Sequence, residues 1–145
     1  MSYEFKKLKV STINLDQENP RFSPVANQRE ALYAMLNEQG DKIYNLANDI
    51  AEHGLDPSKR LIIFKEKDKY IDGYGNRRIT TLKILETPDL IKDHKFYDKF
   101  KKLSKRIGDN KINEVECVIF QSRSSIRHWL EINHNGELDG VGQIP

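Results

Sequence analysis

The chain has 145 residues, the length of one ordinary domain, and a charged share of 32% against an apolar share of 37% indicates a soluble protein with a modest core. The net charge is +2, no apolar run reaches the roughly 18 residues that a membrane span needs, and the basic start leads into no apolar export signal, so we expect a cytoplasmic protein. The one cysteine, Cys117, excludes an internal disulfide, and the four scattered histidines give no zinc-site spacing.

The first half of the chain predicts one strand followed by two helices. Residues 7–13 alternate polar and apolar side chains, as a half-buried strand does. Apolar residues at helical spacing then predict one helix over 27–39 and a second over 41–53. We expect Asp41 to cap the second helix and Gly54 to end it.

The second half predicts three more strands and three more helices. Residues 89–106 combine aromatic and apolar side chains with seven lysines and arginines, which is typical of a basic amphipathic helix. All elements together predict an α+β fold, in which a small mixed sheet is flanked by four or five helices. The remaining strands are expected over 60–65, 69–74 and 115–120, and the helices over 79–85, 89–106 and 126–132.

Positive charge is concentrated in the middle of the chain. Residues 59–106 hold 15 Lys or Arg against 7 Asp or Glu, and the rest of the chain holds 24 − 15 = 9 against 22 − 7 = 15. This asymmetry fits a face for phosphates, either of a nucleotide or of a nucleic-acid backbone. A basic helix that is merely solvated explains it as well.

A glycine-containing turn lies before the helix expected over 79–85. Residues 72–78 read Asp-Gly-Tyr-Gly-Asn-Arg-Arg, with Arg77 and Arg78 next to the helix start. Glycine lets the backbone approach an anion, the first helical N–H groups have no internal partners, and the helix dipole favours negative charge there. The spacing is neither that of a Walker loop nor that of the dinucleotide fingerprint, so a phosphate site and a plain turn with exposed arginines both stay open.

Four blocks of sequence, taken in order, resemble one known family. They are Asn-Pro-Arg-Phe at 19–22, a segment ending in Gly-Leu-Asp-Pro at 46–57, the segment 70–85 around Gly-Asn-Arg-Arg, and the apolar segment 116–120. Their order is similar to that of the ParB/sulfiredoxin superfamily, and above all to its ParB-like N-terminal domains, whose box reads Gly-Glu-Arg-Arg. The resemblance covers roughly residues 8–135.

The resemblance implies a fold and a domain organisation. We expect the ParB/sulfiredoxin fold, formed by one domain over 1–145 with a basic helical insertion near 86–112. ParB proteins read DNA with a domain that follows this one, so we expect the chain to be a fragment of a longer protein. A second copy would then pair through regions beyond Pro145.

In ParB-like domains the glycine-arginine turn holds the triphosphate of a nucleotide, CTP in the chromosome-segregation members, and a downstream acid-asparagine motif supplies magnesium. The resemblance therefore implies a nucleoside triphosphate with Mg²⁺ as the cofactor. It implies magnesium ligands at Glu131 and at Asn133 or Asn135. The implied phosphate contacts are Gly75, Asn76, Arg77, Arg78, Thr80, Thr81 and, from the proline-arginine loop, Arg21.

Three departures from the family pattern bear on activity. Asn76 replaces the acidic residue of the box, and an amide orients water or a metal less well than a carboxylate, which argues against hydrolysis. Ile132 separates Glu131 from Asn133, whereas the family has the two residues adjacent. The box holds no cysteine, since Cys117 lies far downstream, and this excludes sulfiredoxin reductase chemistry.

We therefore expect a ParB-like nucleotide-binding domain that acts as a switch in a DNA-associated protein, with a nucleotide and DNA as partners and no membrane. A CTPase-like nucleoside triphosphatase activity and a ParB-like nuclease activity stay open, with no catalytic residue assigned. One alternative is a nucleic-acid backbone-binding or nuclease module, and another is a catalytically silent interaction domain that packs Trp129 on a partner. Backbone contacts in the first alternative would come from Lys95, Lys99, Lys102 and Arg106.

Overall fold

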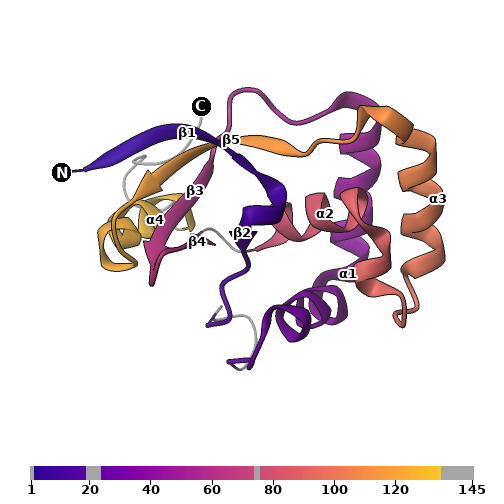
Figure 1. Ribbon diagram of the computed structural model, residues 1–145, viewed down its shortest axis with the longest axis horizontal. Helices are drawn as coiled ribbons and strands as arrows, with labels where there is room; N and C mark the ends of the chain where they lie inside the picture. Colours follow the sequence, from indigo (N-terminus) through magenta and orange to yellow (C-terminus); the bar gives the residue numbers. More distant parts are fainter. Residues whose placement is uncertain (1, 19–23, 74–75, 135–145) are drawn as a thin grey trace.

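The computed structural model describes residues 2–18, 24–73 and 76–134, which form one mixed sheet and the helices that cover it (Figure 1). Within them, five strands lie in the order β1-β5-β3-β4-β2. The β1–β5 and β3–β4 pairs are antiparallel, whereas the β3–β5 and β2–β4 pairs are parallel. The α+β class expected from the sequence is thus confirmed. The strands are β1 (Tyr3–Lys9), β2 (Ile13–Asn14), β3 (Leu61–Glu66), β4 (Lys69–Asp72) and β5 (Glu114–Phe120).

Helices cover both faces of the sheet, but unequally. Three of them pack on one face and on each other, and the fourth lies on the opposite face with a short 3₁₀ turn. Among the described residues, no helix has the length and apolar character needed to cross a membrane. The helices are α1 (Gln28–His53), α2 (Arg77–Glu86), α3 (Tyr97–Ile107) and α4 (Arg127–His134), and the 3₁₀ turns are η1 (Val10–Thr12), η2 (Pro88–Ile91), η3 (Gly108–Asn110) and η4 (Ser124–Ile126).

The central strands β3 and β5 feed two apolar clusters because successive side chains point to opposite faces. Leu61, Ile63 and Ile119 belong to the larger core, which α1, α2 and α3 complete. Phe64 and Phe120 belong to a smaller cluster, closed by Ile126 of η4 and Leu130 of α4. Burial on both faces explains why these segments read as continuous apolar runs rather than as alternating strands.

The two helices predicted over 27–39 and 41–53 form one kinked helix. Gln39 leaves helical geometry, with φ −133° and ψ 28°, but α1 continues through Gly40. A Cβ on Gly40 would lie 2.4 Å from Phe96 Cε2, so this glycine is needed for packing and does not end the helix. The cap predicted at Asp41 is wrong, because Asp41 is interior and Asn27 caps α1 by accepting the Glu30 N–H at 2.9 Å.

Two other predicted boundaries change in the structure. The strand expected over 7–13 is β1, which starts at Tyr3 and gives way to η1 at Val10. Its first five residues are exposed, including the aromatic side chains of Tyr3 and Phe5. The helix expected over 89–106 is split into η2 and α3. Between them the Phe96 N–H donates to His94 Nδ1 at 3.1 Å, in place of a helical carbonyl.

Candidate functional site

The start of α2 lies directly after the end of β4, as expected for the Gly-Asn-Arg-Arg segment. Asn76 occupies the N-cap with a left-handed φ of 63°, and its side chain makes no capping bond to the helix. The first turn contains Arg77 and no acidic residue. The positive end of the α2 dipole therefore carries further positive charge and no neutralising carboxylate of its own.

The Asn76 side chain holds the backbone of Asp16. It is fully buried, its Nδ2 donates to the Asp16 carbonyl at 2.9 Å, and its Oδ1 accepts the Asp16 N–H at 2.9 Å. The pair needs one donor and one acceptor, which an amide supplies and a carboxylate does not. The Asn76 side chain, which the resemblance implied as a phosphate contact, thus holds the Asp16 loop.

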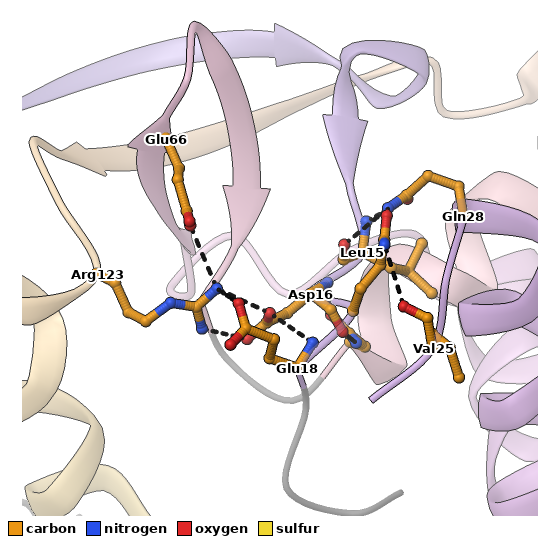
Figure 2. Close-up of polar contacts among 9 residues, drawn as sticks. Leu15, Asp16, Glu18, Val25, Gln28, Glu66 and Arg123 are labelled. Carbon is orange, nitrogen blue, oxygen red and sulfur yellow. Dashed lines mark hydrogen bonds and ion pairs between the residues drawn. The ribbon is translucent and has the colours of Figure 1, made fainter. Parts of the chain in front are cut away.

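The preceding residue is held in the same way from α1 (Figure 2). Gln28 accepts the Leu15 N–H at 2.7 Å and donates to the Leu15 carbonyl at 3.0 Å. Leu15 and Asp16 therefore lie between two side-chain amides, one at the start of α1 and one at the start of α2. This short loop is fixed to both helices although it belongs to no helix or strand.

The two arginines of the box point to different neighbours. Arg77 Nε donates to Gln39 Oε1 at 2.7 Å, at the kink of α1, which fixes its charge beside the helix start. Arg78 lines a pocket of about 300 Å³ formed by the end of α1, the turn at 54–57, β3 and β5. The pocket brings Arg78 next to residues of the 46–57 segment, which are far from it in sequence.

The pocket has an apolar wall and charges of both signs. Asp56 accepts the Ser58 hydroxyl at 2.6 Å and the Ser58 N–H at 2.9 Å, and these bonds hold the pKa of Asp56 below its ordinary value, helped by Lys59 and Arg78. Asp56 is therefore charged at neutral pH. The apolar lining is Leu46, Ile50, Leu55, Pro57, Leu61 and Val115, and the charged lining is Asp49, Asp56, Lys59, Arg78 and Glu116.

The two threonines at the helix start are fully buried. Thr81 Oγ1 donates to the Arg77 carbonyl at 2.8 Å, within α2. Thr80 Oγ1 has no hydrogen-bond partner within the described part of the chain. Neither hydroxyl has the exposure that a phosphate contact needs, so this part of the expected site is not assembled here.

Arg123 forms a charge cluster that the sequence did not indicate (Figure 2). Its Nη1 lies 2.9 Å and its Nη2 3.1 Å from the two carboxylate oxygens of Asp16, and Nη2 lies 3.3 Å from both Glu18 Oε2 and Glu66 Oε2. The hydrogen bonds that Arg123 donates to the Asp16 carboxylate raise the pKa of Arg123 above its ordinary value. Asp16 is thus held by its backbone at the start of α2 and by its side chain at the segment before α4.

The remaining predicted residues lie elsewhere or outside the described part. Glu131 is exposed on α4, whose Leu130 packs on the smaller cluster, on the sheet face opposite the larger core. Arg21, Gly75 and Asn135 lie outside the described residues, as does the side chain of Asn133. Among the described residues, no three metal-ligating side chains gather in a group. Lys95, Lys99, Lys102 and Arg106 are exposed on or just before α3.

Comparison with known proteins finds no family model that matches the chain and no curated protein that matches its sequence. What the chain binds is therefore inferred from the geometry of its own residues.

Proposed function

We propose that the chain binds a nucleoside triphosphate, with the phosphates at the start of α2 and the nucleoside in the adjoining pocket, and that it acts as a switch. The observation that carries this proposal is the position of Arg78. It lies next to the N-terminus of α2 and also lines the pocket that reaches the 54–57 turn. A nucleotide has a charged phosphate chain next to an uncharged nucleoside, so its site needs a positively charged region beside an apolar pocket.

The start of α2 suits phosphates for three reasons. The N-terminal N–H groups of a helix attract anions, and the dipole adds to that attraction. Arg77 is fixed there by Gln39. Arg78 offers a planar group that matches two phosphate oxygens at once.

The pocket suits a ribose and a base. Its apolar wall fits the faces of a ring, and its volume of about 300 Å³ is at the lower end of the range for small-molecule sites. Its carboxylates, Asp49, Asp56 and Glu116, are hydrogen-bond acceptors. They suit the hydroxyls of ribose and the amino group of a base, and would repel phosphate.

Mg²⁺ would bind at this site as a complex with the nucleoside triphosphate. Mg²⁺ usually keeps several waters and binds through substrate phosphates and one or two carboxylates. Glu131 does not fit as its ligand here, because α4 packs on the opposite face of the sheet from the larger core. Asp49, Asp56 and Glu116 are the carboxylates that line the pocket.

The switch would run through Asp16. A ligand that moves the start of α2 also moves Asn76, which holds the Asp16 backbone. Asp16 in turn holds Arg123, at the segment that leads into α4. Binding at the turn would thereby change the position of α4, which is the last described element before the end of the chain.

Isothermal titration with CTP, ATP and GTP in the presence of Mg²⁺ tests the proposal. The wild type should bind at least one nucleotide saturably, and Arg77→Ala/Arg78→Ala should abolish the binding. Arg127→Ala, an exposed arginine on α4, is the matched control and should bind like the wild type. No heat with any of the three nucleotides, from a folded sample, would contradict the proposal.

A further inference from the structure

The seven lysines and arginines between residues 92 and 106 form one exposed region, here called the basic surface. Five of them lie on α3, and Lys92 and Lys95 lie just before it. α3 is at the opposite end of the molecule from the start of β1 (Figure 1). The basic surface therefore lies at the end of the molecule that is opposite the start of β1.

The charges of the basic surface are not neutralised by neighbours. Among the described residues, no carboxylate lies within 4.0 Å of any of the seven cations. Asp98, in the first turn of α3, is exposed and makes no ion pair with these cations in the described part of the chain, and the acidic residues before it have other partners. Asp89 accepts the Tyr97 hydroxyl at 2.7 Å, and Asp93 pairs with Arg29 at 3.3 Å. The field of the basic surface therefore extends into solvent.

Aromatic rings hold three of the lysines without removing their charge. Lys99 lies over Tyr44 at 5.2 Å and over Phe96 at 5.3 Å, and Lys95 lies over Phe96 at 5.8 Å. Lys101 lies over Tyr97 at 5.4 Å. Such cation–π contacts restrict the side chains and leave the full charge available, which lowers the entropy cost of binding an anion.

The apolar side of α3 is already used. Phe100 is 0% and Leu103 is 3% exposed, and Ser104 Oγ donates to the Leu85 carbonyl at 2.8 Å, which ties α3 to α2. A basic helix that binds lipid needs its apolar side for insertion. Here that side is buried in the protein core, so an anionic membrane is a poor match for the basic surface.

We propose that the basic surface binds the phosphodiester backbone of a double-stranded nucleic acid, without reading its sequence. A duplex presents closely spaced phosphates, and a helix carrying cations at intervals of three and four residues presents them along one side. Tyr97 is half-buried and bonded to Asp89, so it does not offer the free ring face on which unpaired bases stack. This binding is separate from the proposed nucleotide site and does not depend on it.

Fluorescence anisotropy of labelled duplexes over a range of salt tests the proposal. The 145-residue chain is titrated into mixed-sequence DNA and RNA duplexes, and into anionic lipid vesicles as a comparison. If four or more phosphates are contacted, raising salt from 50 to 200 mM should weaken duplex binding about 100-fold. Equal affinity for the DNA and RNA duplexes would identify the phosphodiester backbone that they share as the ligand. Tighter binding of one duplex would identify that nucleic acid as the ligand.

Two variants with the same change in charge locate the binding. Lys92→Gln/Lys102→Gln/Lys105→Gln/Arg106→Gln removes four cations of the basic surface for which no ring contact is found in the described residues, so the fold should survive. It should lower the slope of log affinity against log salt by about 3 to 4. Lys6→Gln/Lys9→Gln/Lys67→Gln/Lys69→Gln removes four exposed cations elsewhere and should keep most of the binding.

Three results would overturn the proposal. One is a wild type that binds neither duplex at 50 mM salt. Another is an equal loss of affinity in the two variants, which would mean that overall charge rather than the basic surface attracts the duplex. The third is binding to anionic vesicles, lost in the first variant, without binding to duplexes, which would assign the surface to a membrane. Circular dichroism confirms in each case that the variants are folded.

Discussion

Asn76 and Asp16 are joined by two hydrogen bonds of 2.9 Å, which run between one fully buried side-chain amide and the N–H and carbonyl of one backbone residue. Asn76 also has the left-handed backbone that a residue between β4 and α2 needs. One side chain therefore sets both the path of the turn and the position of the loop beside it.

Asn76→Asp should destabilise the protein by about 2–4 kcal/mol, because it places an unpaired negative charge against the Asp16 carbonyl in a buried site. Asp tolerates the left-handed backbone, so backbone strain does not explain the loss. Urea unfolding measures it, with Asn110→Asp at an exposed position as the control. A loss below about 0.5 kcal/mol would show that the two hydrogen bonds do not hold the turn.

Arg123→Ala should cost about 1–2 kcal/mol, since it leaves the mostly buried Asp16 carboxylate without its two-pronged partner and uncovers Phe64, which lies 4.6 Å from the guanidinium. The comparison is Lys7→Ala, which breaks an exposed pair with Glu116 at 3.9 Å and should cost less than about 0.5 kcal/mol. Urea unfolding of both variants is the measurement. Equal costs would contradict a special role of the Arg123 cluster.

The thiol of Cys117 should make stability fall in alkaline solution. Burial raises the pKa of Cys117 to about 12, and the charge of Asp72 is the second cause. The pKa of a cysteine thiol in the unfolded chain is about 8.5. Below the unfolded pKa both states keep the proton, and stability is unaffected. Between the two values only the unfolded state loses it, so folding weakens by up to about 1.4 kcal/mol per pH unit.

Urea unfolding at several pH values between 8 and 11 checks this expectation. Cys117→Ala lacks the thiol, so the difference in unfolding free energy between the wild type and this variant should shrink as the pH rises above about 8.5. All other titrating groups are common to both proteins. A difference that stays constant over this range would mean that the thiol is not protected from ionisation by burial.

Gly40→Ala should destabilise the protein by about 1–3 kcal/mol, although alanine is the better helix former by about 1 kcal/mol. The added Cβ would lie 2.4 Å from Phe96 Cε2, and Phe96 is buried among α1, α3 and the lysines above it. Glu38→Ala, at an exposed position of the same helix, is the control for helix propensity. A more stable Gly40→Ala protein would refute the close contact between α1 and Phe96.

Sequence patterns predicted the secondary-structure elements whose position depends on neighbouring residues in the chain. β3, β4 and β5 fall close to their expected positions, because apolar runs bounded by turn residues mark buried strands. The kink of α1 was expected to be a break, because glycine is a poor helix former and its packing against Phe96 leaves no local sign.

The candidate site divides in the same way. α2 begins at Arg77, at the end of the turn that the sequence placed before a helix. The hydrogen bonds of Asp16 with Asn76 and with Arg123 join residues 60 and 107 positions apart, and no local pattern predicts them. Polar side chains that bond to a distant backbone follow from the tertiary fold, which is why Asn76 was expected to be a ligand rather than a positioning residue.

Hydrogen–deuterium exchange with and without the nucleotide that binds most tightly, in the presence of Mg²⁺, tests the central claim most directly. Backbone amides exchange when their segment opens locally, and a bound ligand slows this opening in the segments that it contacts. The account predicts slower exchange at the start of α2 and around 54–57, with α3 unchanged. Protection confined to α3, or none at saturating nucleotide, would contradict a nucleotide site at the start of α2.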